Sequence, residues 1–261
     1  MTLEACFNFR DIGGYSTSEG RVVRWGAVYR SGSLHRLTAA DRAVTAELGV
    51  RTVIDLRSIG ELERDGWFGG SDAVSHHHVP LDDANDAQGQ ARDEGVRELG
   101  EAYVEIANAG RFAVANVLRL IAEREHPVVV HCFAGKDRTG IVAALLLSSL
   151  GVPDATITDD YRLSEHSLEP SIAWANDNDL AWAALMASLP PSVLAAPATA
   201  VPLFLGALRE QYGSVDEYLL GAGLDRHVLE ALRARLLEGR LSECEGSERS
   251  GRGSESRVER G

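Results

Sequence analysis

Short apolar runs alternate with longer stretches of mixed apolar and polar residues along the first half of the chain. Residues 50–56 and 127–130 are rich in β-branched side chains and are bounded by Gly, Arg or Pro, a pattern that predicts buried strands. Residues 22–29 and 75–79 are weaker strand candidates. These four segments are the expected strands of the fold.

Helices are predicted between these strands. Thr38 can cap a helix that runs to Leu48, because its hydroxyl can accept a hydrogen bond from a free N–H at the helix start. One face of another helix is marked by apolar residues at helical spacing, namely Phe112, Ala115, Leu118 and Ala122. Strands and helices therefore alternate, and this order predicts an α/β sheet.

The second half of the chain has a mostly helical pattern. Residues 140–150 are apolar almost all round, as expected of a helix buried against a sheet. From residue 154 to residue 237 the helical pattern is broken by Pro190-Pro191 and by an Ala- and Pro-rich stretch at 195–202. We interpret residues 154–237 as a helical lid or layer attached to the core.

The C-terminal stretch, residues 241–261, is dominated by Ser, Glu, Arg and Gly. With almost no apolar side chains it cannot offset the entropy of ordering itself, so a disordered tail is predicted. Residues 1–240 are expected to form one catalytic domain that includes the helical layer, because α/β domains of this size often fold around one core.

The overall composition is that of a soluble globular protein, with 44% hydrophobic and 25% charged residues. The longest apolar run, residues 141–147, is far shorter than the roughly 18 residues of a spanning helix, so no integral membrane segment is predicted. Residues 1–10 lack the pattern of a secretory signal. We expect a cytoplasmic location, and export by a route without a signal peptide stays open.

Cysteine use and net charge narrow the chemistry. Cys6, Cys132 and Cys244 are far apart and form no C-x-x-C pair, which argues against a disulfide framework and a structural zinc site. A free thiol is therefore available. The formal net charge of −13 argues against nucleic acid or an anionic membrane as a partner. An anionic substrate must be captured by local positive charge.

A run of histidines, His76, His77 and His78, invites a metal-site interpretation. Consecutive residues of a strand alternate between its two faces, so these three rings cannot converge on one ion. We expect no metal and no other cofactor.

The segment 131–140, HCFAGKDRTG, lies between a predicted buried strand and a predicted buried helix. In such an arrangement backbone N–H groups curl around a phosphate, and the helix N-terminus adds the positive end of its dipole. The same field favours the thiolate of Cys132, which is the reactive form of cysteine. Cys132 is therefore the expected nucleophile, in a phosphate-binding loop formed by Phe133, Ala134, Gly135, Lys136 and Arg138.

Three polar residues of this segment have expected roles beside the cysteine. The planar guanidinium of Arg138 can grip two phosphate oxygens and stabilise the charge of phosphoryl transfer, which lysine cannot do in a bidentate manner. Thr139 can donate its hydroxyl to the sulfur of Cys132 or assist hydrolysis. His131 is expected to orient the loop by hydrogen bonding. The alternative is an inert buried cysteine beside a solvated charge cluster.

The string His-Cys-x5-Arg-Thr resembles the loop of the protein tyrosine phosphatase superfamily. The Lys136-Asp137 pair and the segments 8–15 (NFRDIGGY) and 29–38 (YRSGSLHRLT) are similar to bacterial phosphatases of the mycobacterial PtpB type. The similarity extends in order and spacing from about residue 7 to about residue 240.

This resemblance implies a phosphotyrosine-phosphatase-like α/β core, with a mostly parallel central sheet flanked by helices and a helical lid. It implies hydrolysis of phosphomonoesters through a phosphocysteine intermediate. The implied substrates are phosphotyrosine proteins, with phosphoserine, phosphothreonine and phosphoinositides as further classes. It also makes Arg10 and Asp11 supports of the loop.

Hydrolysis through a phosphocysteine needs an acid for the leaving group and later a base for water. Asp137 precedes Arg138 within the loop, and the resemblance assigns the acid to this position. Many tyrosine phosphatases use an aspartate on a separate upstream loop instead, so Asp82 and Asp83 remain alternatives. Asp137 could also be a structural partner of Arg138 or of a neighbouring amide.

Further residues near the loop have two interpretations each. Asp55 ends a predicted strand beside Arg57, where it could shape the pocket or form an ion pair. Lys136 could add charge at the rim of the loop, as in lipid phosphatases of the superfamily, or be exposed to solvent. Phe133 could be a wall of the pocket or pack beneath the loop. Aromatic and apolar residues of the predicted lid could pack on the core or contact the ligand: Trp174, Trp182, Leu185 and Met186.

Two other functions compete with the phosphatase hypothesis. A phosphate-binding pseudophosphatase usually lacks the cysteine, the arginine or the acid, and all three residue types are present here. A thiol redox enzyme of the arsenate-reductase or rhodanese kind also uses a thiolate loop. It would lack an obvious resolving cysteine, because Cys6 and Cys244 are distant from Cys132 in the sequence.

Overall fold

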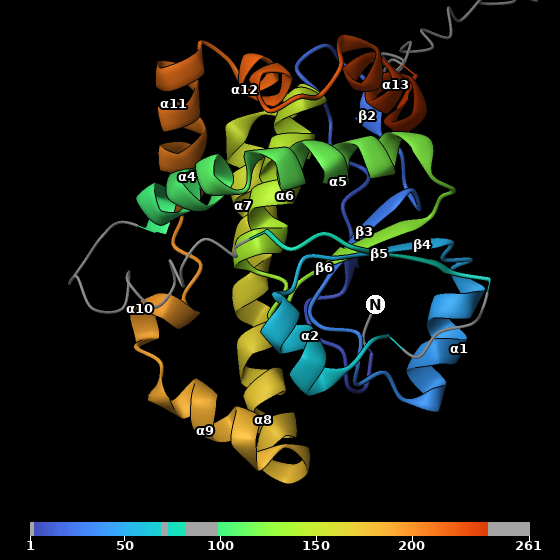
Figure 1. Ribbon diagram of the computed structural model, residues 1–261, viewed down its shortest axis with the longest axis vertical. Helices are drawn as coiled ribbons and strands as arrows, with labels where there is room; N and C mark the ends of the chain where they lie inside the picture. The colour runs from blue at the N-terminus through green and yellow to red at the C-terminus, as the bar shows by residue number, and fades with distance from the viewer. Residues whose placement is uncertain (1–2, 69–72, 82–98, 240–261) are drawn as a thin grey trace, which may run out of the picture.

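The computed structural model describes residues 3–68, 73–81 and 99–239 (Figure 1). Its main sheet has five strands in the order β1-β3-β6-β4-β5, and four neighbouring strands are parallel, with β1 antiparallel at one edge. The strands are β1 (Arg10–Asp11), β3 (Val28–Ser31), β6 (Val128–His131), β4 (Thr52–Asp55) and β5 (Ser75–His78). The predicted α/β fold with a mostly parallel sheet is confirmed.

The two central strands β4 and β6 are buried along their whole length. Their side chains alternate between two apolar clusters: Ile54, Val128 and Val130 belong to the larger cluster, whereas Val53 and Val129 belong to the smaller. Parallel strands covered on both faces have this near-continuous apolar character. For this reason residues 50–56 and 127–130 were recognisable as strands.

The prediction of one strand over residues 22–29 is wrong. Strand β2 (Val22–Val23) pairs with β7 (Leu237–Glu238) in a separate two-stranded sheet, and only β3 joins the main sheet. The chain turns at Gly26, which has a φ of 69° and donates its N–H to Asp11 Oδ2 at 2.6 Å. An apolar run interrupted by a left-handed glycine cannot continue as one strand.

Helices cover both faces of the sheet (Figure 1). Helix α1 (Ala39–Glu47), capped by Thr38 as predicted, adds apolar residues to the smaller cluster, and α2 (Ile59–Asp65) lies near the same face. The helices α4 (Leu99–Ala109), α5 (Arg111–Glu123) and α6 (Asp137–Ser149) pack in the larger cluster on the other face. Phe112 is 65% exposed, so the predicted buried face of α5 is wrong at this position, where the helix has just begun.

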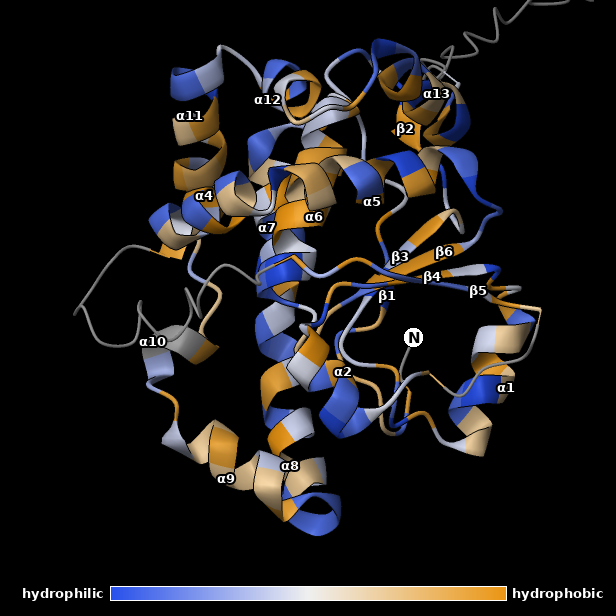
Figure 2. Ribbon diagram, in the orientation of Figure 1, coloured by the Kyte–Doolittle hydropathy of each residue, from blue (hydrophilic) through white to orange (hydrophobic). Residues whose placement is uncertain are grey.

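The remaining helices form two groups. One group continues the main core: α7 (Asp154–Arg162), α11 (Ala200–Tyr212), α12 (Val215–Gly221) and α13 (Arg226–Leu236). The other, which we call the lid, extends away from it: α8 (Leu168–Asn178), α9 (Leu180–Ser188) and α10 (Pro191–Leu194), joined to α7 by the 3-10 helix η1 (Leu163–Ser167). Figure 2 shows the apolar character of α6 and α9.

The lid has its own small apolar cluster, built from Ala175, Trp182 and Met186 and packed against Phe7 and Phe133 of the core. Pro191 begins α10, in agreement with the predicted break at Pro190-Pro191. Within the described residues, no helix has both the length and the apolar character needed to cross a membrane. The extent of the catalytic domain remains a prediction, and the tail predicted at 241–261 lies outside the described residues.

Candidate active site

The loop predicted to bind phosphate connects β6 to α6. Cys132 follows the last residue of β6 and is 2% exposed, and α6 begins at Asp137 with Lys136 as its N-cap. The strand, loop and helix predicted from the sequence are thus confirmed. They place the thiol beside the N-terminal end of a buried helix, where free N–H groups and the helix dipole favour an anion.

The carbonyl groups of the loop point outward. Phe133 O accepts from Ser33 N at 2.8 Å, and Asn8 Nδ2 donates to the carbonyls of Ala134 and Gly135 at 3.1 and 2.9 Å. Because the N–H of a peptide points opposite to its C=O, the N–H groups of the following residues face the inside of the loop. The loop is therefore shaped as an anion cradle.

A buried charged network holds the loop from behind. Arg30 donates to Gly135 O at 2.9 Å and is paired with Asp160 at 2.6 Å, while Arg10 donates to Asp160 at 2.9 Å and to Asn8 Oδ1. Although burial alone would raise the pKa of Asp160, the guanidinium groups of Arg30 and Arg10 hold it below its ordinary value. Asp160 therefore stays ionised and fixes both arginines.

The expected support by Arg10 is thus indirect, through Asn8 and Asp160. Asp11 instead accepts the N–H groups of Gly13 and Gly26, at 2.8 and 2.6 Å, and stabilises a turn away from the loop. The sequence pattern did not predict Asn8, Arg30 or Asp160.

Gly135 lies against the backbone that follows β3. It has a φ of 69°, and a Cβ at this position would lie 2.5 Å from Gly32 N and would also contact Ser31 O. The absence of a side chain at Gly135 thus lets the loop backbone lie directly against the neighbouring chain segment.

We expect Gly135→Ala to destabilise the fold by about 2 kcal/mol more than Gly49→Ala. Both glycines have a φ of 69°, but a Cβ at Gly49 meets nothing within 4 Å, so the difference isolates the clash at the loop. Urea unfolding of both variants measures it. Equal losses of stability would show that the loop moves away from Ser31 without cost.

Arg138 reaches into the site from the first turn of α6. Its Nη1 and Nη2 donate to the two carboxylate oxygens of Glu61 at 2.5 and 2.8 Å. Burial opposes ionisation of Glu61, but the hydrogen bonds from Arg138 outweigh it and lower its pKa. The pair fixes the plane of the guanidinium, which a bidentate grip on phosphate requires.

Glu61 was not predicted as a site residue. It is the third residue of α2, and its Oε2 also accepts the N–H of Ser58 at 2.8 Å in a capping box. The Ser-x-x-Glu spacing was a visible signal for this helix start. The signal could locate the glutamate but not its contact with Arg138.

Asp137 and Lys136 lie on the lid side of the loop. Lys136 Nζ donates to Ala195 O, directly after α10, at 2.8 Å and lies 3.3 Å from Asp137 Oδ1. Its side chain is 8% exposed, so the interpretation of Lys136 as a solvent-exposed lysine is wrong. Asp137 contacts the pocket, whereas Asp82 and Asp83 lie outside the described residues.

Asp55 and His131 form a buried pair beneath the loop. Asp55 Oδ2 accepts from Arg57 Nη2 at 2.7 Å, which confirms the ion-pair interpretation of Asp55. His131 Nε2 lies 3.6 Å from Asp55 Oδ2, and its Nδ1 lies 3.2 Å from the carbonyl oxygen of Cys132. Burial lowers the pKa of His131, so the neutral ring can orient this carbonyl.

The expected hydrogen bond from Thr139 to Cys132 is not formed. Thr139 is fully buried, and its hydroxyl has no hydrogen-bond partner within the part of the chain that the structure describes. Thr139 lines a small cavity between the sheet and α6 that is also lined by Arg30, Val130 and Val142. The rotation of α6 directs this side chain toward the sheet.

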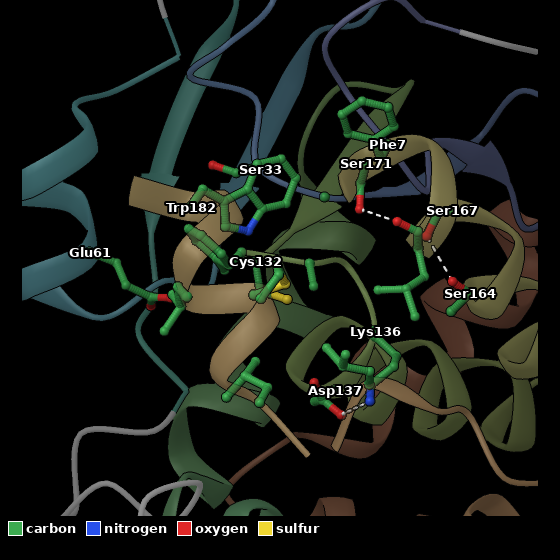
Figure 3. A pocket seen from close by; sticks show the side chains of 18 of the residues that line it. Phe7, Ser33, Glu61, Cys132, Lys136, Asp137, Ser164, Ser167, Ser171 and Trp182 are labelled. Carbon is green, nitrogen blue, oxygen red and sulfur yellow. Dashed lines mark hydrogen bonds and ion pairs between the residues drawn. The ribbon is translucent and has the colours of Figure 1, made fainter. Parts of the chain in front are cut away.

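A pocket of about 170 Å³ lies over Cys132, between the loop and the lid (Figure 3). Arg138, Asp137 and Glu61 line its polar part. Its apolar walls include Phe133, whose ring lies edge-on to Trp182 with a centroid separation of 6.0 Å. The lining residues Trp182, Leu185 and Met186 come from the lid. Trp182 and Met186 also pack in the apolar cluster of the lid, whereas Leu185 lines the pocket without belonging to that cluster.

Arg36 joins the core to the lid at the edge of this pocket. Its guanidinium lies 4.3 Å from the ring centroid of Trp182 and pairs with Asp179 at 2.7 Å. Asp179 also caps α9 by accepting the N–H of Trp182 at 3.0 Å. The position of the indole ring over the site is thus fixed by three contacts.

The thiol of Cys132, the guanidinium of Arg138 and a loop whose carbonyl groups point outward together form an anion cradle of the kind found in cysteine-dependent phosphatases. The sequence matches the tyrosine phosphatase family over residues 1–238. The chain belongs to that family, as the loop motif predicted.

Curated proteins that resemble this chain are named as phosphatases. Over 146 residues the chain is 36% identical to a tyrosine-protein phosphatase of Nostoc commune, covering 53% of this chain and 49% of that protein. It is 34% identical over 140 residues to the triple specificity protein phosphatase PtpB of Mycobacterium tuberculosis, covering 50% of each. The chain spans about half the length of the curated relatives it matches.

Among solved structures, TpbA of P. aeruginosa is 22% identical, with a TM-score of 0.36 and coverage of 67% of this chain and 98% of that one. The catalytic core of the PP-IP phosphatase SIW14 of S. cerevisiae is 14% identical, with a TM-score of 0.37 and coverage of 62% and 78%.

Proposed function

We propose that the chain is a protein tyrosine phosphatase that hydrolyses phosphomonoesters through a phosphocysteine intermediate. The observation that carries this proposal is the convergence of Cys132, Arg138 and Asp137 on one pocket, over a loop whose carbonyls face outward. These are the nucleophile, the phosphate clamp and the acid of the reaction.

In the first step the thiolate of Cys132 attacks phosphorus, and the bond from phosphorus to the leaving oxygen breaks. The loop N–H groups and Arg138 hold the phosphoryl oxygens while charge spreads over them. Asp137 gives its proton to the leaving oxygen. In the second step Asp137 takes a proton from water, which attacks phosphorus and releases the thiolate of Cys132.

The walls of the pocket support an aryl phosphate as the main substrate. Phe133 and Trp182 offer ring edges and faces to a phenol, and such contacts are absent for the short side chain of phosphoserine. The proposal extends to phosphoserine, phosphothreonine and phosphoinositides, the further substrate classes that the family resemblance implies. One relative is described as a triple specificity protein phosphatase, which is in line with more than one class. The cytoplasmic location remains a prediction.

The redox alternative is disfavoured by the surroundings of Cys6. This thiol is buried, its sulfur lies 3.0 Å from Ser31 Oγ, and burial raises its pKa to about 12. A resolving cysteine needs an accessible thiol that can become a thiolate. The third cysteine, Cys244, lies outside the described residues.

Release of phosphate from a phosphotyrosine peptide, with chelator present, tests the proposed function. We expect turnover, with kcat/KM for the phosphotyrosine peptide at least about tenfold above that for the matched phosphoserine peptide or a soluble phosphoinositide. Binding of the phosphotyrosine peptide without turnover would support a pseudophosphatase instead.

The acid is tested by Asp137→Asn with two aryl phosphates. We expect kcat to fall about 100-fold for phenyl phosphate, whose leaving group is a strong base, and much less for 4-nitrophenyl phosphate. Steady-state kinetics with both compounds give the comparison. Asp82→Asn is the matched variant, and a larger dependence on the leaving group there would move the acid to the upstream loop.

A further inference from the structure

Two buried tyrosines lie behind Asp137. Tyr103 on α4 and Tyr161 on α7 are each 1% exposed, and their hydroxyl oxygens lie 2.7 Å apart. Tyr103 Oη donates to Asp137 Oδ1 at 2.6 Å. The two tyrosine hydroxyls, one from each helix, thus form a hydrogen-bonded chain that ends at the proposed acid, Asp137.

Which hydroxyl donates and which accepts along this chain follows from the number of protons that each group has. Tyr103 has one hydroxyl proton, which it donates to Asp137, so Tyr161 must donate to Tyr103. Burial and the neighbouring charge of Asp137 raise the pKa of Tyr103 well above its ordinary value, and burial raises the pKa of Tyr161. Both phenols are therefore donors at neutral pH.

The two carboxyl oxygens of Asp137 have different surroundings. Oδ1 accepts from Tyr103 and lies 3.3 Å from Lys136 Nζ. For Oδ2 the structure shows no hydrogen bond within the described residues. An oxygen that already faces two donors is a poor place for a proton, so the proton of the neutral acid belongs on Oδ2. Figure 3 shows Asp137 beside Lys136 on the side of the pocket opposite Trp182.

We propose that Tyr103, backed by Tyr161, is a positioning residue of the reaction. It holds Oδ1 so that Oδ2 carries the proton that passes to the leaving oxygen, and it stabilises the carboxylate that remains. This inference rests on the proposed function, in which Asp137 is the acid. Besides Asp137, the charged groups near this site are Lys136, which lies beside Asp137, and Arg30 on β3 and Glu165 in η1, which lie near Tyr161.

The variant that tests this role is Tyr103→Phe, which keeps the ring and removes the donor. For phenyl phosphate we expect kcat to fall about tenfold with little change in KM, because one hydrogen bond to the acid is lost. For 4-nitrophenyl phosphate, which hardly needs an acid, we expect less than about a threefold change. Tyr161→Phe is expected to change kcat in the same direction by a smaller factor.

Tyr218→Phe is the matched control. Tyr218 is as buried as Tyr103, and its hydroxyl donates to Ala107 O at 2.6 Å, away from Asp137. We expect equal, small effects of this variant on both substrates. If Tyr103→Phe also affects both substrates equally, its role is structural and the positioning role is overturned.

A double variant separates this inference from the proposed function. In an Asp137→Asn background, Tyr103→Phe should cause no further loss with phenyl phosphate. A multiplicative loss would overturn the positioning role while leaving Asp137 as the acid. If Asp137→Asn alone shows no dependence on the leaving group, the acid assignment fails and the role of Tyr103 fails with it.

Discussion

Replacing Cys132 with serine should lower kcat for phenyl phosphate by about 10⁴-fold or more. The hydroxyl of serine stays protonated at neutral pH and is a much weaker nucleophile than the sulfur of cysteine, and so the phosphorylated intermediate hardly forms. The loop N–H groups, Arg138 and the outward carbonyls are unchanged by this substitution. Affinity for a phosphotyrosine peptide should therefore remain within about threefold of the original.

Steady-state kinetics and calorimetric titration of the peptide together check this expectation. Cys6→Ser is the matched control, because Cys6 is buried to a similar extent but its sulfur faces Ser31. It should retain kcat within a few fold. Turnover by the Cys132 variant at the original rate, or equal losses in both variants, would show that Cys132 is not the nucleophile.

The sequence predicted those parts of the site that are contiguous along the chain. The strand, the loop and the start of α6 lie within residues 128–149, and their pattern is local: a β-branched run, a glycine-containing turn and an apolar helix. The cysteine and arginine were identified because the loop fixes their spacing. Local rules of this kind act before any tertiary contact is known.

The supports of the loop could not be predicted, because they join distant segments. Glu61 meets Arg138 across 77 positions, and Arg30 meets Asp160 across 130. A buried carboxylate and a surface carboxylate have the same appearance in a sequence. Only the register of β3 beside β6 brings Arg30 under the loop.

The errors have the same origin. The apolar run at residues 22–29 has the pattern of one strand, but the turn at Gly26 divides it between two sheets. Thr139 was expected beside the sulfur because it is close in sequence, but it lines the cavity between the sheet and α6 instead. Proximity along the chain does not determine which way a side chain faces.

Arg138→Lys should lower kcat for the same substrate by about 10³-fold, which is the second-largest effect we expect. Two hydrogen bonds to Glu61 fix the plane of the guanidinium, and a planar group in a fixed orientation is what a two-point grip on phosphate oxygens requires. A lysine has a single point of charge and cannot hold Glu61 and two phosphate oxygens together. Because lysine keeps the positive charge, the fall in kcat measures the contribution of the planar, two-point geometry of the guanidinium.

Glu61→Gln tests the same geometry from the other side. The amide keeps one acceptor oxygen for Arg138 and loses the negative charge, so we expect kcat to fall about tenfold, which is a much smaller effect than that of Arg138→Lys.

Arg209→Lys is the matched control for Arg138→Lys, since Arg209 makes a similar two-point pair with Asp154, at 2.5 and 2.8 Å, outside the pocket. Steady-state kinetics that give equal losses for Arg138→Lys and Arg209→Lys would mean that both act through stability, and the clamp assigned to Arg138 would be wrong.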